Sequence, residues 1–435
     1  MRNLHYKKGL SPSDVKNATV YSAPFVILLF YLFIEYGRPQ NLIPVLVAIH
    51  PGIIIVGLLC LSLLSNFKLL QLKTIQTKQF FMLLLLMTLH VPIAKNNYWA
   101  YQIWYSMIIY FLVFLGITSF VNSFHKIEKF VNFWILINLA GAVIGIKNGG
   151  MVPGSTFMGD ENDFALVMNM AIPFSYFMFL GTTSKRKKVF YIIASGIFVA
   201  ASVSSLSRGG FIGLIVSFLY CWYKSPKKLL GIIFVSLLMG VLFFTASDEY
   251  FNEIRSIKEE NVEEGTGAIR WYYWKLGWKM FLDHPIIGVG QGNFPWNIHD
   301  YEPPEGFYGR FHGGRAAHSL YFTLIPELGT VGIILFAGIL FYSLRDSRYI
   351  LTINKRQFLK HPSYKLTTDL IYHVNKMKFI VFGLTGALLA YLITGAFLSV
   401  LYYPHFWLLS AIPVAIRNVT KKELTLLEQS NKSQN

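Results

Sequence analysis

The sequence predicts an all-α polytopic membrane protein with about twelve transmembrane helices and one long extracytoplasmic loop that carries amphipathic helices. Three observations support this fold class. Apolar residues make up 54% of the 435 residues and charged residues only 14%, whereas a typical soluble domain carries about 25% charged residues. The apolar residues fall in long runs. Lys and Arg gather in alternate connections between those runs.

Twelve apolar segments are long enough, or nearly so, to cross a bilayer, which requires about 20 helical residues. They lie at about 19–36, 43–65, 80–95, 102–121, 130–146, 164–181, 188–206, 209–223, 229–246, 319–344, 379–398 and 401–416. The eighth and the twelfth are the shortest. The first lacks a small-residue cleavage site, so we expect it to stay in the protein as a signal anchor.

The basic residues predict the orientation of these segments. With both termini in the cytoplasm, 28 of the 39 Lys and Arg residues fall inside and 11 outside, as the positive-inside rule requires. Residues 1–246 then form spans one to nine, and 247–318 the extracytoplasmic loop. Residues 319–435 form the last three spans, with a basic cytoplasmic loop at 345–378 and a cytoplasmic tail. The formal charge of +17 therefore reflects topology and contact with anionic lipid, not nucleic acid.

Two arginines are candidates for binding an anion at the outer face. Arg208 follows an apolar segment and precedes Gly209 and Gly210, which allow close approach of backbone or ligand. Its alternative role is that of an interfacial anchor. Arg270 lies near the start of an expected amphipathic helix over 268–282, which carries three tryptophans suited to the membrane boundary. A guanidinium at a helix start favours anion binding.

His318 is the candidate for proton transfer, and Glu327 is a candidate for lining a polar cavity. His318 stands where the polar loop enters the tenth span, and a neutral imidazole there could act as a base toward a hydroxyl. A lone histidine is more often structural, and His284, His299 and His312 provide comparisons. Glu327 lies deeper in the same segment, where a carboxylate should face a polar cavity or a partner.

Several site classes have no signature in the sequence. There is no Walker A motif, no dinucleotide-binding glycine fingerprint and no Cys/His cluster for zinc. Cys60 and Cys221 lie in apolar runs and are expected to pack there. Asp160 and Asp163 could hold a divalent ion, but a solvated loop is the commoner role of such a cluster. We therefore expect no cofactor and no metal.

Four motifs follow one another along the chain: Gly159-Asp-Glu-Asn-Asp-Phe164, Ser207-Arg-Gly-Gly210, the Arg270 helix followed by His284-Pro-Ile-Ile-Gly-Val-Gly-Gln-Gly-Asn-Phe294, and Ala317-His-Ser-Leu-Tyr321 with Pro326-Glu-Leu-Gly-Thr-Val-Gly332. Their order resembles the O-antigen ligase and polymerase-like superfamily. The family more often has Asn at the position of Ser319. Phe33-Ile-Glu-Tyr-Gly-Arg-Pro-Gln40 is similar to O-glycosylation ligases associated with exosortase systems.

The resemblance implies a metal-independent glycosyltransferase of the bacterial inner membrane whose active site faces the periplasm. Its donor would be a glycan on a polyprenyl diphosphate such as undecaprenyl diphosphate, and its acceptor lipid A-core of lipopolysaccharide, a glycan or a protein. Arg208 and Arg270 would bind the diphosphate and His318 would be the base. Arg315, Asn162 and Glu327 complete the candidate substrate-binding residues.

Other functions remain open at this stage. A polymerase of the same superfamily would extend a glycan for O-antigen or exopolysaccharide instead of attaching it. A flippase or exporter of lipid-linked glycan should show paired inverted halves with charges at midmembrane. A structural scaffold would leave Arg208, Arg270 and His318 dispensable. The gathering of polar residues at one face favours the enzyme.

Overall fold

The computed structural model describes residues 22–43, 45–246, 248, 250–251, 266–353 and 364–432. Over these residues the secondary structure is helical, apart from one isolated β-bridge between Phe307 and Arg310. The expectations for the basic N-terminus, for the first part of the 247–318 loop and for the middle of the 345–378 loop fall on residues outside this described part.

The bundle is built from helices that coincide with all twelve predicted apolar segments. The helices that make up the bundle are α2 (Ala23–Gly37), α3 (Pro39–Leu42), α4 (Val45–Ile49), α5 (Pro51–Ser65), α6 (Ile75–Ile93), α7 (Asn97–Phe120), α8 (Phe124–Lys147), α9 (Glu161–Gly181), α10 (Lys185–Ser204), α11 (Arg208–Lys224), α12 (Lys228–Thr245), α16 (Leu320–Thr352), α17 (Tyr364–Thr394), α18 (Pro404–Leu409) and α19 (Ala411–Lys432). Two further helices, α14 (Thr266–Asp283) and α15 (Phe294–Tyr301), lie within the long loop.

The number of membrane spans is smaller than expected when length and hydropathy are applied to the described helices. Seven of them are long and apolar enough to cross a membrane: Val45–Ser65, Asn97–Phe120, Phe124–Lys147, Glu161–Gly181, Lys185–Ser204, Leu320–Thr352 and Leu370–Phe397. The first and ninth predicted segments form shorter apolar helices, Ala23–Gly37 and Lys228–Phe244. The expectation of a multi-pass helical membrane protein is met, whereas the count of about twelve is not confirmed.

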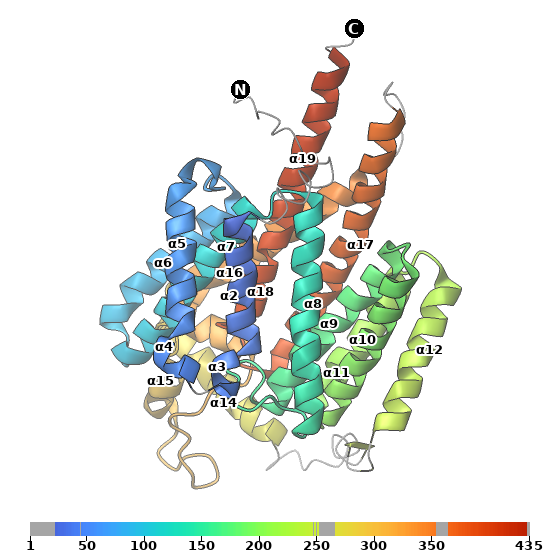
Figure 1. Cartoon of the computed structure of the whole chain (residues 1–435). Helices are drawn as coiled ribbons and strands as arrows, with labels where there is room; N and C mark the ends of the chain where they lie inside the picture. The colour runs from blue at the N-terminus through green and yellow to red at the C-terminus, as the bar shows by residue number, and fades with distance from the viewer. Residues whose placement is uncertain are drawn as a thin grey trace.

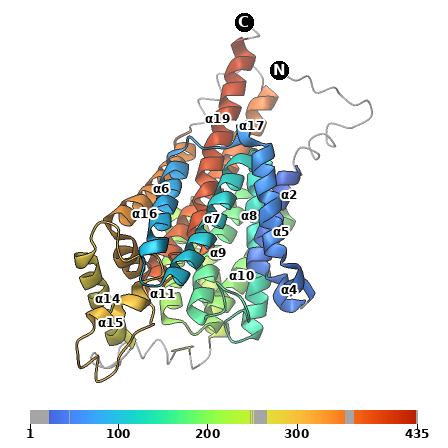
Figure 2. The ribbon, with the colours of Figure 1, turned by 90° about the vertical axis from the view of Figure 1, so that its left-hand side faces the viewer.

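Consecutive long helices run in opposite directions, so the connections collect at two ends of the bundle (Figures 1 and 2). Helices α14 and α15 lie at one end, with the turns before α9 and before α11. The end of α19 and the start of α17 lie at the other end (Figure 1). This arrangement brings segments that are far apart in sequence to one end, which we call the α14 end.

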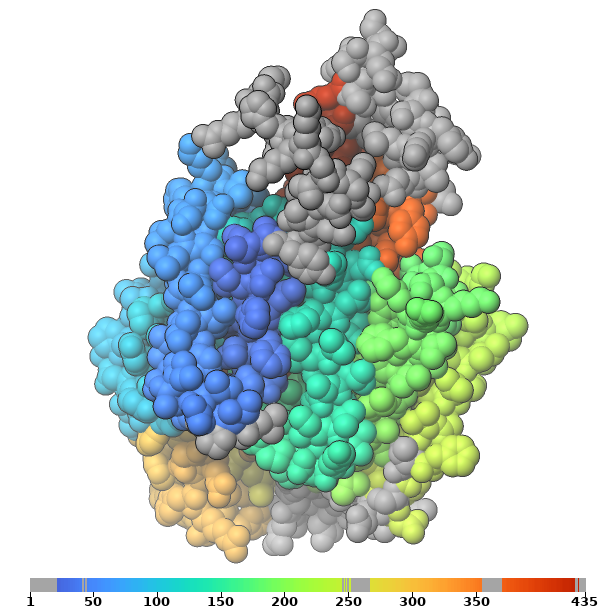
Figure 3. All heavy atoms as spheres, in the orientation of Figure 1, coloured from blue at the N-terminus to red at the C-terminus, as the bar shows by residue number. Residues whose placement is uncertain are grey.

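Helix α9 is the centre of the bundle, and α5 and α12 are at its edge. About 83% of the most apolar stretch of α9 is buried, compared with 11% for the Val45–Ser65 stretch. Figure 3 shows the face on which α5, α8 and α12 present their side chains. Large apolar side chains are exposed on α5 and α12, including Leu61 at 61% and Phe244 at 93%. Such a surface fits contact with lipid tails.

In the last third of the chain, helices extend beyond the predicted apolar segments. Helix α16 continues to Thr352 and α17 begins at Tyr364, so both helices extend well into the loop expected at 345–378. The segment after Arg417, expected to form a cytoplasmic tail, is helical to Lys432. Buried Asp346 explains part of this extension, because it accepts a hydrogen bond from Gln76 (2.8 Å) and pairs with Arg417 (3.3 Å).

Candidate functional site

His318 lies immediately before Ser319, the N-cap residue of α16, and has a backbone conformation that few residues adopt. Its φ is +48°, in the left-handed region, where histidine is more common than bulky or β-branched residues. The next residue, Ser319, caps α16 by accepting a hydrogen bond from the Phe322 amide (3.3 Å). Asn and Ser are about equally good as N-caps, which accounts for serine at this position of the motif. The cap thus fixes the point from which the imidazole projects.

Charged groups from three separate segments surround His318. The imidazole ring stacks at 6.4 Å on Tyr273 of α14. Partial loss of hydration, together with the positive charges of Arg270 and Arg315, lowers the pKa of His318 from its ordinary value, while the Asp160 carboxylate acts in the opposite direction. The side chain still retains exposure to solvent. An exposed imidazole thus experiences the charges of two guanidiniums and one carboxylate, and its pKa is lowered overall.

The comparison histidines in the loop have different surroundings. His312 shares a hydrogen bond with Tyr273 (2.8 Å), and His299 lies 3.2 Å from the carboxylate of Glu302. His284 is exposed. Among the described residues, no protein group hydrogen-bonds a ring nitrogen of His318. Its nitrogens are therefore available to a ligand, whereas those of His312 and His299 are partly engaged.

The second predicted arginine, Arg208, lies at the first residue of α11 and is half-buried at the α14 end. Its neighbour Ser207 caps α11 and donates a hydrogen bond to Asn162 (2.7 Å). Asp160 caps α9 by accepting hydrogen bonds from the backbone amides of Asn162 and Asp163, and it thereby fixes the position of Asn162. Arg208 is thus connected to the His318 cluster through Asp160. The convergence of Arg208 and Arg270 on one ligand remains a prediction.

Asn162 and the acidic pair beside it have structural partners. Asp163 accepts a hydrogen bond from Tyr403 (2.7 Å), and Asp160 acts as the helix cap. Neither forms part of a group of three or more His, Cys, Asp or Glu side chains suited to a metal ion, within the described residues. Their hydrogen bonds hold the N-termini of α9 and α11 together and keep the Asp160 carboxylate near His318.

Glu327 is 2% exposed, and both of its oxygens have protein partners. One oxygen accepts from the Gly292 amide (2.7 Å) and the Tyr402 hydroxyl (2.7 Å), and the other accepts from the Phe294 amide (3.0 Å). We expected this carboxylate to face a polar cavity, to assist the histidine or to pair with an arginine. Its observed hydrogen bonds instead attach the 284–294 segment and the loop before α18 to α16.

A break in α16 makes this fastening possible. Gly329 has φ +59° and ψ −164°, so the helix is interrupted there. The carbonyls of Pro326 and Glu327 are consequently free to accept hydrogen bonds from the amides of Val289 and Gly290, each at 2.9 Å. A Cβ at Gly329 would lie 2.6 Å from the nearest backbone oxygen of the crossing segment. Glycine is required for this close approach.

The polar residues of the 284–294 motif anchor it to α6 and α7. The buried Gln291 amide donates to the carbonyls of Met87 (2.9 Å) and Ala100 (3.0 Å), and its oxygen lies 3.0 Å from His90. Asn293 exchanges hydrogen bonds with the backbone of Asn96. The motif therefore joins α16 to α6 and α7 and forms the connection from α14 to α15.

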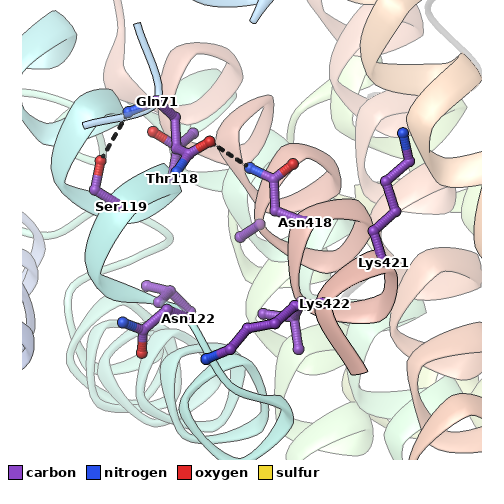
Figure 4. A pocket seen from close by; sticks show the side chains of 10 residues that line it. Gln71, Thr118, Ser119, Asn122, Asn418, Lys421 and Lys422 are labelled. Atoms are coloured by element: carbon purple, nitrogen blue, oxygen red, sulfur yellow. Dashed lines mark hydrogen bonds between the residues drawn. The ribbon is translucent and has the colours of Figure 1, made fainter. Parts of the chain in front are cut away.

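Two cavities differ in position and lining. Figure 4 shows one of about 340 Å³, lined by the end of α7 and by α19, where Gln71 bonds Ser119 (3.3 Å) and Asn418 (3.1 Å) beside Lys422. It lies away from the α14 end. The second, of about 540 Å³, is lined by residues of α2, α7 and the loops before α9 and α18. This second cavity shares its wall with the segments that hold the His318 cluster.

Sequence reasoning missed several residues that shape this region. Tyr273, Tyr402 and Tyr403 position charged groups, yet nothing in their local sequence separates them from the other tyrosines of the chain. Asp160 was considered only as a metal ligand. The signal that could have identified it is the Asp-x-Asn-Asp spacing before an apolar run, which is typical of a helix N-cap.

The fold and this cluster define a multi-pass helical membrane protein with a group of ionisable side chains around His318 at the α14 end. The family model described as O-antigen ligase matches residues 193–337, about a third of the chain. This match confirms the resemblance to the O-antigen ligase-like superfamily, and it covers Arg208, Arg270, Arg315, His318 and Glu327. A comparison with curated proteins gives no match.

Proposed function

We propose that this protein is a glycosyltransferase that moves a glycan from a polyprenyl diphosphate to an acceptor hydroxyl at the outer face of the bacterial inner membrane. The observation that carries the proposal is the His318 cluster. An exposed imidazole stacks on Tyr273 of α14 at the α14 end of an apolar bundle, and the charges of Arg270 and Arg315 lower its pKa. All of these residues lie within the stretch that matches the O-antigen ligase family.

In this proposal the guanidiniums hold the diphosphate. Arginine pairs bidentately with phosphate oxygens, and its charge stabilises the diphosphate as it leaves. Arg270 and Arg315 are close to His318, and Arg208 would bind from the neighbouring end of α11. Asn162 and Glu327 act as positioning residues, since their described hydrogen bonds orient protein segments.

His318 acts as the general base. The acceptor oxygen attacks the anomeric carbon of the sugar, the bond from that carbon to the diphosphate oxygen breaks, and the diphosphate leaves with the electron pair. The hydroxyl proton moves to a ring nitrogen of His318. The lowered pKa keeps the imidazole unprotonated at neutral pH, as a base requires.

Binding of undecaprenyl diphosphate to the purified protein tests the donor site. We expect Arg270→Gln to weaken binding by about tenfold or more, the usual scale for a lost charge-assisted hydrogen bond. Arg270→Lys should recover only part of it, because an ammonium cannot replace a bidentate fork. Lys279→Gln is the matched control, since it removes one exposed charge from the same helix. Equal binding by Arg270→Gln and Lys279→Gln would contradict the assignment.

Product analysis separates ligase from polymerase. Wild-type protein is given lipid-linked glycan with and without lipid A-core, and products are identified by mass spectrometry. Transfer to lipid A-core indicates a ligase. A ladder of longer lipid-linked glycans formed without the acceptor indicates a polymerase.

A further inference from the structure

The Phe33–Gln40 motif has no role in the site described so far, yet it borders the larger cavity. This cavity of about 540 Å³ is lined by Glu35 and Arg38 from the end of α2, and by Trp99, Ser106 and Tyr110 from α7. Residues of two loops complete the lining: Thr156, Phe157, Ser399, Tyr402 and Tyr403 are among them. Its volume is within the range of about 300–1,000 Å³ that is usual for small-ligand sites.

The two charged groups in this cavity retain hydrogen-bonding capacity. Arg38 donates from Nε to the backbone carbonyl of Glu35 (3.2 Å), and its guanidinium lies 5.5 Å from the centre of the Phe157 ring. Within the described residues, no hydrogen bond or ion pair joins the Glu35 carboxylate to another side chain. Arg38 also has φ +45°, an uncommon conformation for a residue with a side chain.

A further polar atom in the cavity wall is unpartnered. The Ser399 hydroxyl is buried and has no hydrogen-bond partner in the described part of the chain. Buried polar groups are normally paired, so an orphaned hydroxyl beside a cavity indicates a missing ligand or solvent partner. The cavity thus offers a carboxylate that accepts hydrogen bonds, a guanidinium that donates them, and hydroxyls that can do either.

The composition of the lining favours a neutral, hydroxyl-rich ligand. Glu35 and Arg38 have opposite formal charges, and the described lining residues include no second basic side chain of the kind that would pair with a diphosphate. Sugar hydroxyls both donate and accept, and therefore match a carboxylate and a guanidinium placed together. The faces of Trp99 and Phe157 offer apolar surface for the C–H side of a sugar ring.

The cavity is connected to the His318 cluster by two adjacent tyrosines. Tyr402 and Tyr403 line it, and their hydroxyls bond Glu327 of α16 and Asp163 of α9 respectively, each at 2.7 Å. Asp163 lies three residues beyond Asp160, whose charge acts on His318. A group in the cavity would therefore contact the tyrosines that hydrogen-bond Glu327 of α16 and Asp163 of α9.

We propose that the Glu35–Arg38 cavity is a sugar-binding subsite that selects the glycan handled by this protein. The inference rests on the proposed function and adds to it a specificity-determining site outside the stretch that matches the ligase family. The sugar could belong to the lipid-linked donor or to the acceptor, and both would use the same hydrogen bonds.

Cysteine protection tests occupancy of the cavity. Ser106, in the lining, is replaced by cysteine after Cys60→Ser and Cys221→Ala remove the native thiols. The purified protein is labelled with a maleimide in the presence of three probes: sugar-free undecaprenyl diphosphate, lipid-linked glycan extracted from the host cells, and lipid A-core. Protection by lipid-linked glycan assigns the subsite to the donor, and protection by lipid A-core assigns it to the acceptor.

Protection by sugar-free undecaprenyl diphosphate equal to that by lipid-linked glycan would overturn the sugar assignment, as would no protection by any probe. In the same preparations, Glu35→Gln should weaken binding of the protecting probe by about tenfold, the scale of one lost charged hydrogen bond. It should leave binding of undecaprenyl diphosphate unchanged, whereas Arg270→Gln should weaken the latter. If wild-type protein fails to bind undecaprenyl diphosphate at all, the proposed function fails independently of the subsite.

Discussion

Glu327 offers the most direct test of how the site is supported. Its carboxylate accepts from two backbone amides and one tyrosine hydroxyl, and the side chain is 2% exposed. Glu327→Ala leaves all three donors without a partner. An unsatisfied buried donor costs about 1–3 kcal/mol, so the sum is roughly 3–9 kcal/mol before any water enters the space.

Glu327→Gln should cost less, because only one side of the amide can accept. With the amide oxygen toward Gly292 and Tyr402, the amide NH2 faces the Phe294 N–H, so the Phe294 amide loses its acceptor and the new NH2 group has none. At about 1–3 kcal/mol for each unpaired donor, we expect a loss of roughly 2–6 kcal/mol. Tyr402→Phe removes a single hydrogen bond and leaves both backbone amides satisfied.

The midpoint temperatures of thermal unfolding, measured for the purified variants in detergent, test this order of stability. The expected sequence of midpoints is wild type, then Glu327→Gln, then Glu327→Ala, with Glu305→Ala as an exposed glutamate control that unfolds like wild type. If Glu327→Ala unfolds at the wild-type temperature, the carboxylate is not the fastening point between α16 and the two loops.

Two further predictions concern the crossing segment and the base. Gly329→Ala should lower the unfolding temperature and the transfer rate, because its Cβ would lie 2.6 Å from a backbone oxygen, whereas Gly57→Ala, with no atom within 4 Å, should lower neither. Asp160→Asn keeps the helix cap but removes the charge that raises the pKa of His318, so the acid limb of the pH–rate profile should move to lower pH. Arg315→Gln should move that limb to higher pH, and an acid limb identical in both variants would contradict the arrangement.

The helices were predictable because apolar runs are long and uniform, and each predicted segment contains a helix. Their ends were harder to predict. Asp346 looks like a loop residue in sequence, yet it is buried because Gln76 and Arg417, far away in the chain, satisfy its carboxylate. Such pairings also affect the number of membrane spans. A helix that crosses the membrane can contain polar side chains where neighbouring helices supply hydrogen-bond or ion-pair partners for them.

The candidate site was predictable where a residue is chemically unusual for its position. Arg270 and His318 stand out in an apolar chain, and the structure brings them together. Glu327 stood out for the same reason, but its polar surroundings are backbone amides supplied by a distant glycine-rich loop. The Glu35–Arg38 cavity could not be inferred, since its walls come from four separate segments.

The central claim is that His318 takes the proton of the acceptor hydroxyl, and His318→Ala tests it most directly when donor binding and transfer are measured on the same preparation. General-base catalysis typically contributes about 10²–10⁴ in rate. We predict a loss of that order in transfer, with undecaprenyl diphosphate bound as in wild type and His299→Ala nearly unaffected. Full transfer activity in His318→Ala would contradict the account, and a loss confined to donor affinity would reassign His318 as a diphosphate ligand.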